Sequence, residues 1–68
     1  MPQVIVYPPA EDGGRRVRVA DSFAGMAYTV IDLVEFLRRA GLGDVEPEDV
    51  LGAEWIEWRG GGPQDWPR

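Results

Sequence analysis

The clearest hydrophobic pattern in the chain lies between residues 28 and 42. At 100° per residue, six apolar side chains of this stretch fall on one arc of about 160°, the width of a core-facing helical stripe. These side chains are Val30, Leu33, Val34, Phe36, Leu37 and Ala40. Charged residues fill the opposite side, with Ile31 alone among them. The pattern therefore predicts an amphipathic helix that buries one face.

Both ends of this helix are marked by local signals. Thr29 can act as the N-cap by accepting a hydrogen bond from the N–H of Asp32. The Asp32 carboxylate can reach back to the N–H of Thr29, as in a capping box. Gly41 can adopt the left-handed conformation that ends a helix, so that Leu42 folds back onto Leu37.

Shorter patterns predict two strands before the helix. Residues 3–7 form a β-branched run that is apolar on both faces, as in a central strand, and the two prolines that follow should stop it. Residues 15–20 alternate with a period of two, which directs the valines to the core and Arg16 and Arg18 to water. Asp-Gly in the connection between the two runs is a hairpin signal.

The rest of the chain adds weaker elements. Residues 23–27 read as a third strand, in which Gly25 indicates a bulge or a close backbone approach. Residues 47–51 begin with proline and two acids and predict a single helical turn. Residues 53–59 form the last strand, and the glycines and proline of residues 60–63 should release a flexible tail.

Together these elements predict an α+β fold in the order β-β-β-α-β. A small antiparallel or mixed sheet carries the amphipathic helix on one face, and the last strand joins the sheet beside the first. We expect a single domain over residues 1–59 and a Gly/Pro-rich tail over residues 60–68.

Composition argues against an enzyme. The 68 residues include neither cysteine nor histidine, so thiol chemistry, the usual proton shuttle and the commonest metal ligand are missing. Ser22 and Thr29 have no histidine to activate them. The acids of residues 44–49 lack the ligand spacing of a calcium loop. We therefore expect no catalysis, no metal and no cofactor.

Charge and hydropathy limit the partners. The formal net charge of −5 argues against nucleic acid and anionic membranes. No apolar run approaches the length of a membrane span, and the first residues do not resemble a signal peptide. We therefore expect a cytoplasmic protein. Every basic residue is arginine, which fits a G+C-rich genome or a demand for guanidinium groups at a binding site.

Three stretches carry a resemblance to known sequences. Residues 15–19, 32–42 and 57–63 resemble small uncharacterised proteins of streptomycetes and related actinobacteria, and the arginine-only composition agrees with such a source. The resemblance implies an origin and carries no activity.

The tryptophans suggest where the protein could bind a partner. In a regular strand Trp55 and Trp58 point to opposite faces, and Ile56 shares the face of Trp58. We expect Trp58 to be buried against the helix and Trp55 to lie on the uncovered face with Tyr7. Either that face binds a partner, or the tail folds back and Trp66 covers it.

The arginines of the second strand form a local basic patch on an acidic chain. Arg15, Arg16 and Arg18 are either a solvated face paired with Glu54 or Glu57 across the sheet, or a docking patch for an acidic partner. The complete set of residues expected to bind a partner is Tyr7, Arg16, Arg18, Trp55, Glu57, Arg59 and Trp66.

These observations favour a non-enzymatic protein–protein interaction or regulatory module. Its partner would be another protein or a second copy in a homodimer, bound through the uncovered sheet face. The alternative is an accessory subunit or small-ligand-binding partner of a larger enzyme, although a small molecule is not the expected ligand. A third reading, an acidic inhibitor or antitoxin-like protein, would need its acids along one face, and here they are scattered.

Overall fold

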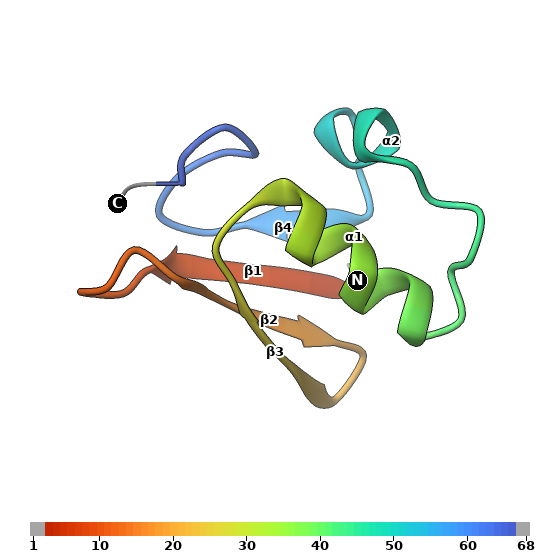
Figure 1. Cartoon of the computed structure of the whole chain (residues 1–68), viewed down its shortest axis with the longest axis horizontal. Helices are drawn as coiled ribbons and strands as arrows, with labels where there is room; N and C mark the ends of the chain where they lie inside the picture. The colour runs from red at the N-terminus through yellow and green to blue at the C-terminus, as the bar shows by residue number, and fades with distance from the viewer. Residues whose placement is uncertain (1–2, 67–68) are drawn as a thin grey trace.

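The protein is one four-stranded sheet with a helix on one face. The computed structural model describes residues 3–66. Its elements are β1 (Val4–Pro9), β2 (Arg15–Val19), β3 (Ser22–Ala27), α1 (Val30–Arg39), α2 (Pro47–Leu51) and β4 (Ile56–Trp58). The strand order is β3-β2-β1-β4, with β4 parallel to β1 and the other neighbours antiparallel. Figure 1 shows α1 lying across the sheet. The predicted α+β fold is confirmed, including the last strand beside the first.

Helix α1 begins and ends where its local signals predict. Thr29 is the N-cap, and its hydroxyl accepts a hydrogen bond from the N–H of Asp32 at 3.3 Å. The Asp32 carboxylate accepts from the N–H of Tyr28 at 2.9 Å, one residue earlier than the predicted capping box. Gly41 has φ 103°, and the N–H groups of Gly41 and Leu42 donate to carbonyls of the last turn at 3.1 and 3.0 Å. These two bonds form a Schellman motif.

The core lies between α1 and the sheet face beneath it. Helix α1 contributes Leu33, Val34 and Leu37, and α2 adds Val50. The buried side chains of the strands are Val4, Val6, Arg15, Val17, Ala27 and Ile56. In the part of the chain that the structure describes, no helix has the length and hydropathy needed to span a membrane.

Gly25 has both properties that its position predicts. The β2–β3 register shifts opposite it, which is a bulge, and Gly25 has φ 147°. A Cβ atom here would lie 2.8 Å from Cζ of Phe36, closer than side chains normally approach. The glycine therefore lets the Phe36 ring rest directly on the sheet.

Two strands differ in length from their prediction. β1 continues through both prolines, because the register shifts after Val6 and Pro9 then pairs with Arg15. Such an irregularity is where a strand tolerates proline. β4 covers only Ile56–Trp58 instead of residues 53–59. It pairs with β1 alone, along Val4 to Val6, and the N–H of Arg59 donates one more hydrogen bond to the Val6 carbonyl at 2.9 Å.

Candidate protein-binding face

The sheet face opposite α1 carries exposed apolar and arginine side chains. The register places Ile5, Arg18 and Phe23 side by side across three strands. Arg16 lies beside Met26 in the same way. Phe23 is 62% exposed, more than any other large hydrophobic residue of the described chain. Of the two apolar faces of the first strand, the one with Ile5 therefore points away from the helix.

Two shallow hollows open on this face and share two residues. One has a volume of about 320 Å³ and is lined by Tyr7, Arg16, Arg18, Asp21 and Phe23. The other has a volume of about 220 Å³ and is lined by Tyr7, Pro8, Ala10, Arg16 and Met26. Tyr7 and Arg16 therefore line both hollows, into which side chains of a partner can fit.

Three of the predicted residues meet at one end of the face. The Arg59 guanidinium lies 5.3 Å from the centre of the Tyr7 ring, a cation–π distance. Arg59 also pairs with Glu57. The expected pairing of Glu57 with the arginines of β2 is therefore wrong, since the Glu57 carboxylate pairs with Arg59 instead.

Arg16 and Arg18 stay available on this face. Both are exposed. Among residues 3–66, neither side chain makes an ion pair or a hydrogen bond. An exposed guanidinium without a partner, next to Tyr7 or Phe23, matches the composition of interface centres.

The structure separates Trp66 from this face. Trp66 packs at right angles to Trp58 on the helix side, with ring centres 6.3 Å apart, and both rings border the core. Its indole N–H donates to the carbonyl of Pro63 at 2.8 Å. Both predictions for Trp66 are therefore wrong, because it neither joins the open face nor covers it. Trp58 is half-buried on the predicted side, but its aromatic partner is Trp66.

Trp55 lies in the turn that precedes β4 and is 37% exposed. The alternation that assigned it to the open face holds only within a strand, and β4 begins one residue later. The face as the structure has it therefore rests on Tyr7, Arg16 and Arg18, together with Phe23, which the sequence analysis did not single out.

Arg15 corrects the predicted basic patch. It is fully buried on the helix side of β2, although its two arginine neighbours face water. Its guanidinium lies 5.4 Å from the ring centres of both Trp58 and Trp66. Burial lowers the pKa of this guanidinium, and the nearby Asp65 carboxylate opposes that shift.

Backbone carbonyls surround the buried guanidinium. Its three nitrogens donate five hydrogen bonds of 2.8–3.1 Å, to the carbonyl oxygens of Tyr7, Arg59, Gly61, Gly62 and Asp65. Four of these acceptors belong to the chain that follows β4. The expected release of a flexible tail at residues 60–63 is therefore wrong for the described part, because Arg15 holds residues 59–66 against the sheet.

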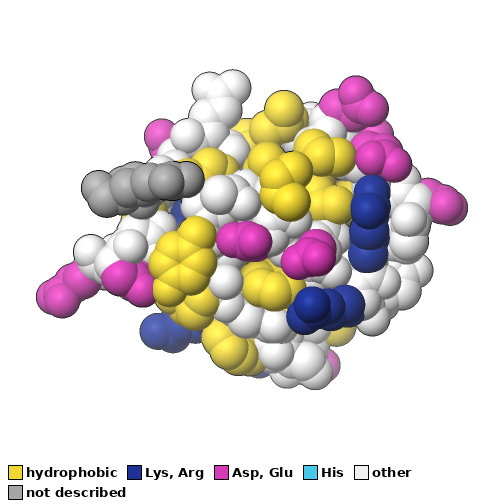
Figure 2. Space-filling view, viewed as in Figure 1, with side chains coloured by type: hydrophobic (Ala, Val, Ile, Leu, Met, Phe, Trp, Pro, Cys, Tyr) yellow, Lys and Arg dark blue, Asp and Glu magenta, His cyan; other side chains and the backbone are white. Residues whose placement is uncertain are grey.

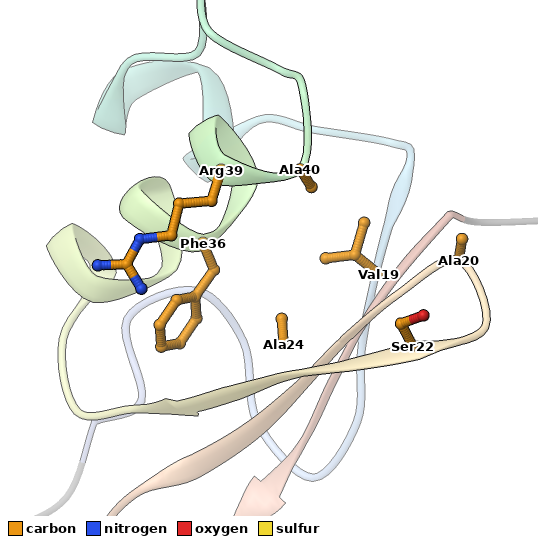
Figure 3. A pocket seen from close by; sticks show the side chains of 7 residues that line it. All are labelled: Val19, Ala20, Ser22, Ala24, Phe36, Arg39 and Ala40. Carbon is orange, nitrogen blue, oxygen red and sulfur yellow. The ribbon is translucent and has the colours of Figure 1, made fainter.

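A third hollow lies on the helix side, between the C-terminal half of α1 and the β2–β3 turn (Figure 3). Its volume is about 370 Å³. Figure 3 shows the Phe36 ring and the Val19 side chain pointing into it, with the Arg39 side chain at its border. The other residues that line it are Ala20, Ser22, Ala24 and Ala40.

The acids near α2 take part in helix capping. The N–H of Glu46 donates to the Asp49 carboxylate at 2.9 Å, and Arg38 pairs with Glu46 at 3.2 Å. Within residues 3–66, no group of three or more acidic side chains is arranged to hold a metal ion. Comparison of the chain with protein-family models, curated proteins and solved structures found no match.

Proposed function

We propose that the protein is a non-enzymatic interaction module that binds another protein through the open face of its sheet. The observation that carries the proposal is the row of Ile5, Arg18 and Phe23, with Phe23 62% exposed, beside hollows lined by Tyr7 and Arg16. Aromatic and arginine side chains dominate the binding energy of protein interfaces. An open sheet face with these residues favours binding of a partner protein over catalysis.

The amino-acid composition also supports a binding role. The chain has no histidine or cysteine, so the side chains around the two hollows offer no neutral-pH proton shuttle and no thiol nucleophile. We place the interaction in the cytoplasm, on the sequence evidence that no apolar run reaches the length of a membrane span.

Affinity capture from the native host tests this proposal, with two variants that remove similar apolar surface from opposite sides. Phe23→Ser alters the open face, whereas Ile31→Ser alters α1, where Ile31 is 57% exposed. We expect the wild type and Ile31→Ser to retain the same partner, and Phe23→Ser to lose it. Retention of that partner by Phe23→Ser, with both variants folded by circular dichroism, would refute the proposal.

Self-association uses the same pair of variants. If a second copy is the partner, sedimentation equilibrium will show a dimer for wild type and Ile31→Ser and a monomer for Phe23→Ser. A dimer that all three proteins share would place the interface elsewhere and contradict the assignment of the open face.

A small-ligand or accessory role is the second candidate, and the hollow beside Phe36 favours it. A volume of about 370 Å³ with mostly apolar walls lies within the range of small-molecule sites. Arg39 also lines the hollow, and a guanidinium group can pair with a ligand that joins an apolar body to a carboxylate. Titration with short-chain carboxylic acids should shift the amide NMR signals of Val19 and Ala24. Unchanged signals at both residues would remove this candidate.

A further inference from the structure

We infer that the open face binds an extended acidic segment of its partner, with carboxylates on alternate residues of that segment. The inference rests on the proposed function and adds the chemistry of the partner. Arg16 and Arg18 carry it, because both are exposed on one face of β2 and, among residues 3–66, neither has an ion-pair or hydrogen-bond partner.

The spacing of the two arginines sets the spacing of the acids. β2 lies between β1 and β3 in the sheet, so ladders on both sides hold its extended backbone. Side chains two residues apart on such a strand are separated by about 6.6 Å along it. An extended peptide has the same repeat, and acids at its positions i and i+2 can therefore reach Arg16 and Arg18 together. Guanidinium groups favour carboxylates because the fork can donate two parallel hydrogen bonds.

The neighbours of the arginines supply the apolar part of the contact. Arg16 is the cross-strand neighbour of Met26, and Arg18 is the cross-strand neighbour of Phe23. Tyr7, on β1, lines both hollows. A peptide bound here would exclude water from the ion pairs, which strengthens them relative to pairs on an open surface.

The distribution of charge permits an acidic partner although the chain carries −5 overall. Figure 2 views the helix side and shows acidic side chains grouped near α2. At physiological ionic strength, charges farther apart than about 8 Å are largely screened. On the open face, Glu57 is paired with Arg59, and Asp21 is the acid that lines a hollow with the two free arginines. Nucleic acid is disfavoured, since two guanidinium groups cannot offset repulsion along a phosphate backbone.

Synthetic peptides test the inference on the full chain. The first peptide has about eight residues, enough to span β2, with Glu alternating with Val or Thr. The second has the same composition with its Glu residues adjacent, the third has Gln in place of Glu, and the fourth has phosphoserine. Fluorescence anisotropy at low ionic strength measures their binding. We expect the alternating Glu peptide to bind most tightly, and its affinity to fall as salt is added.

Arginine variants locate the bound peptide. We expect Arg16→Gln and Arg18→Gln each to weaken binding of the alternating peptide about tenfold, the equivalent of about 1.4 kcal/mol. Arg38→Gln removes an exposed arginine from α1, one that pairs with Glu46, and should leave the affinity unchanged. All three variants should keep the circular dichroism spectrum of the wild type, because these side chains are exposed.

Four results would overturn the inference. They are equal binding of the adjacent-Glu peptide, equal binding of the Gln peptide, tighter binding of the phosphoserine peptide, and equal weakening by Arg38→Gln. The proposed function is judged separately, by loss of the native partner from Phe23→Ser. If that loss occurs but no peptide binds, the face is an interface for a partner of other chemistry.

Discussion

Replacing Arg15 by lysine keeps the positive charge but should still destabilise the protein strongly. The guanidinium donates five hydrogen bonds to carbonyl oxygens. An ammonium group has three donors, so at least two carbonyls would lose theirs. A hydrogen bond to a charged group contributes about 1.5–3 kcal/mol. We therefore expect Arg15→Lys to lower the free energy of unfolding by about 3 kcal/mol, toward the lower end of that sum because water can reach part of the segment.

That loss is large for a chain of this size. At about 0.05–0.15 kcal/mol per residue, a domain of this length has a total stability of roughly 3–10 kcal/mol. Urea denaturation followed by far-ultraviolet circular dichroism measures the loss. Arg16→Lys is the matched control on the same strand, because Arg16 is exposed, and it should change stability by less than about 0.5 kcal/mol.

A double-mutant cycle with Trp66→Ala tests how Arg15 acts. The Arg15 guanidinium lies 5.4 Å from the centre of the Trp66 ring, and the segment of Trp66 supplies carbonyl acceptors. The two substitutions should therefore be non-additive, with a coupling energy of about 1 kcal/mol. Equal denaturation midpoints for Arg15→Lys and Arg16→Lys would refute the proposed role of the buried guanidinium. Strict additivity with Trp66→Ala would show that Arg15 does not act through the C-terminal segment.

Three further predictions concern other parts of the fold. Gly60→Ala should lower the free energy of unfolding, measured by urea denaturation, by at least about 1–2 kcal/mol. The reasons are that Gly60 has φ 72° and that a Cβ there would lie 2.5 Å from the Pro8 ring. The control Gly43→Ala should be nearly neutral, because nothing lies within 4 Å of the added Cβ. Gly41→Val should cost about 1–2 kcal/mol from φ 103° alone, and an unchanged midpoint would contradict the Schellman ending of α1. The Tyr28 hydroxyl donates to the Asp12 carboxylate at 2.7 Å, which lowers the pKa of Asp12 and raises the pKa of Tyr28. The difference in unfolding free energy between the wild type and Tyr28→Phe should therefore be constant at intermediate pH. It should vanish as the pH falls below the Asp12 pKa or rises above the Tyr28 pKa. A difference that does not change with pH would exclude this hydrogen bond.

Local signals along the chain were sufficient for most of the fold. The cap at Thr29, the ending at Gly41 and the apolar stripe between them each depend on residues within about one helical turn of one another. The alternation of Arg16 and Arg18 with valines likewise needs no distant contact to direct them to water. For the same reason, the two free arginines of the candidate face were found from the sequence.

The parts that were missed depend on contacts between distant residues. Arg15 lies at an inward position of β2, but whether an arginine can occupy it depends on acceptors elsewhere. Its five carbonyl partners lie between 8 and 50 residues away in the chain. Burying a charge is unfavourable until such partners surround it, so the charge of Arg15 favoured an exposed side chain despite its inward position.

The position of Trp66 has the same cause. Glycines and a proline before it allow many backbone paths, and no local pattern selects the one that returns to the helix side. The Arg15 guanidinium selects it, because the ring centres of both Trp58 and Trp66 lie 5.4 Å from it and the carbonyls of the intervening chain accept its hydrogen bonds. The sequence by itself determined the elements and the free arginines. Only the tertiary structure decided that one arginine would be buried and would hold the C-terminal segment, because that arrangement forms only when all its partners are in place.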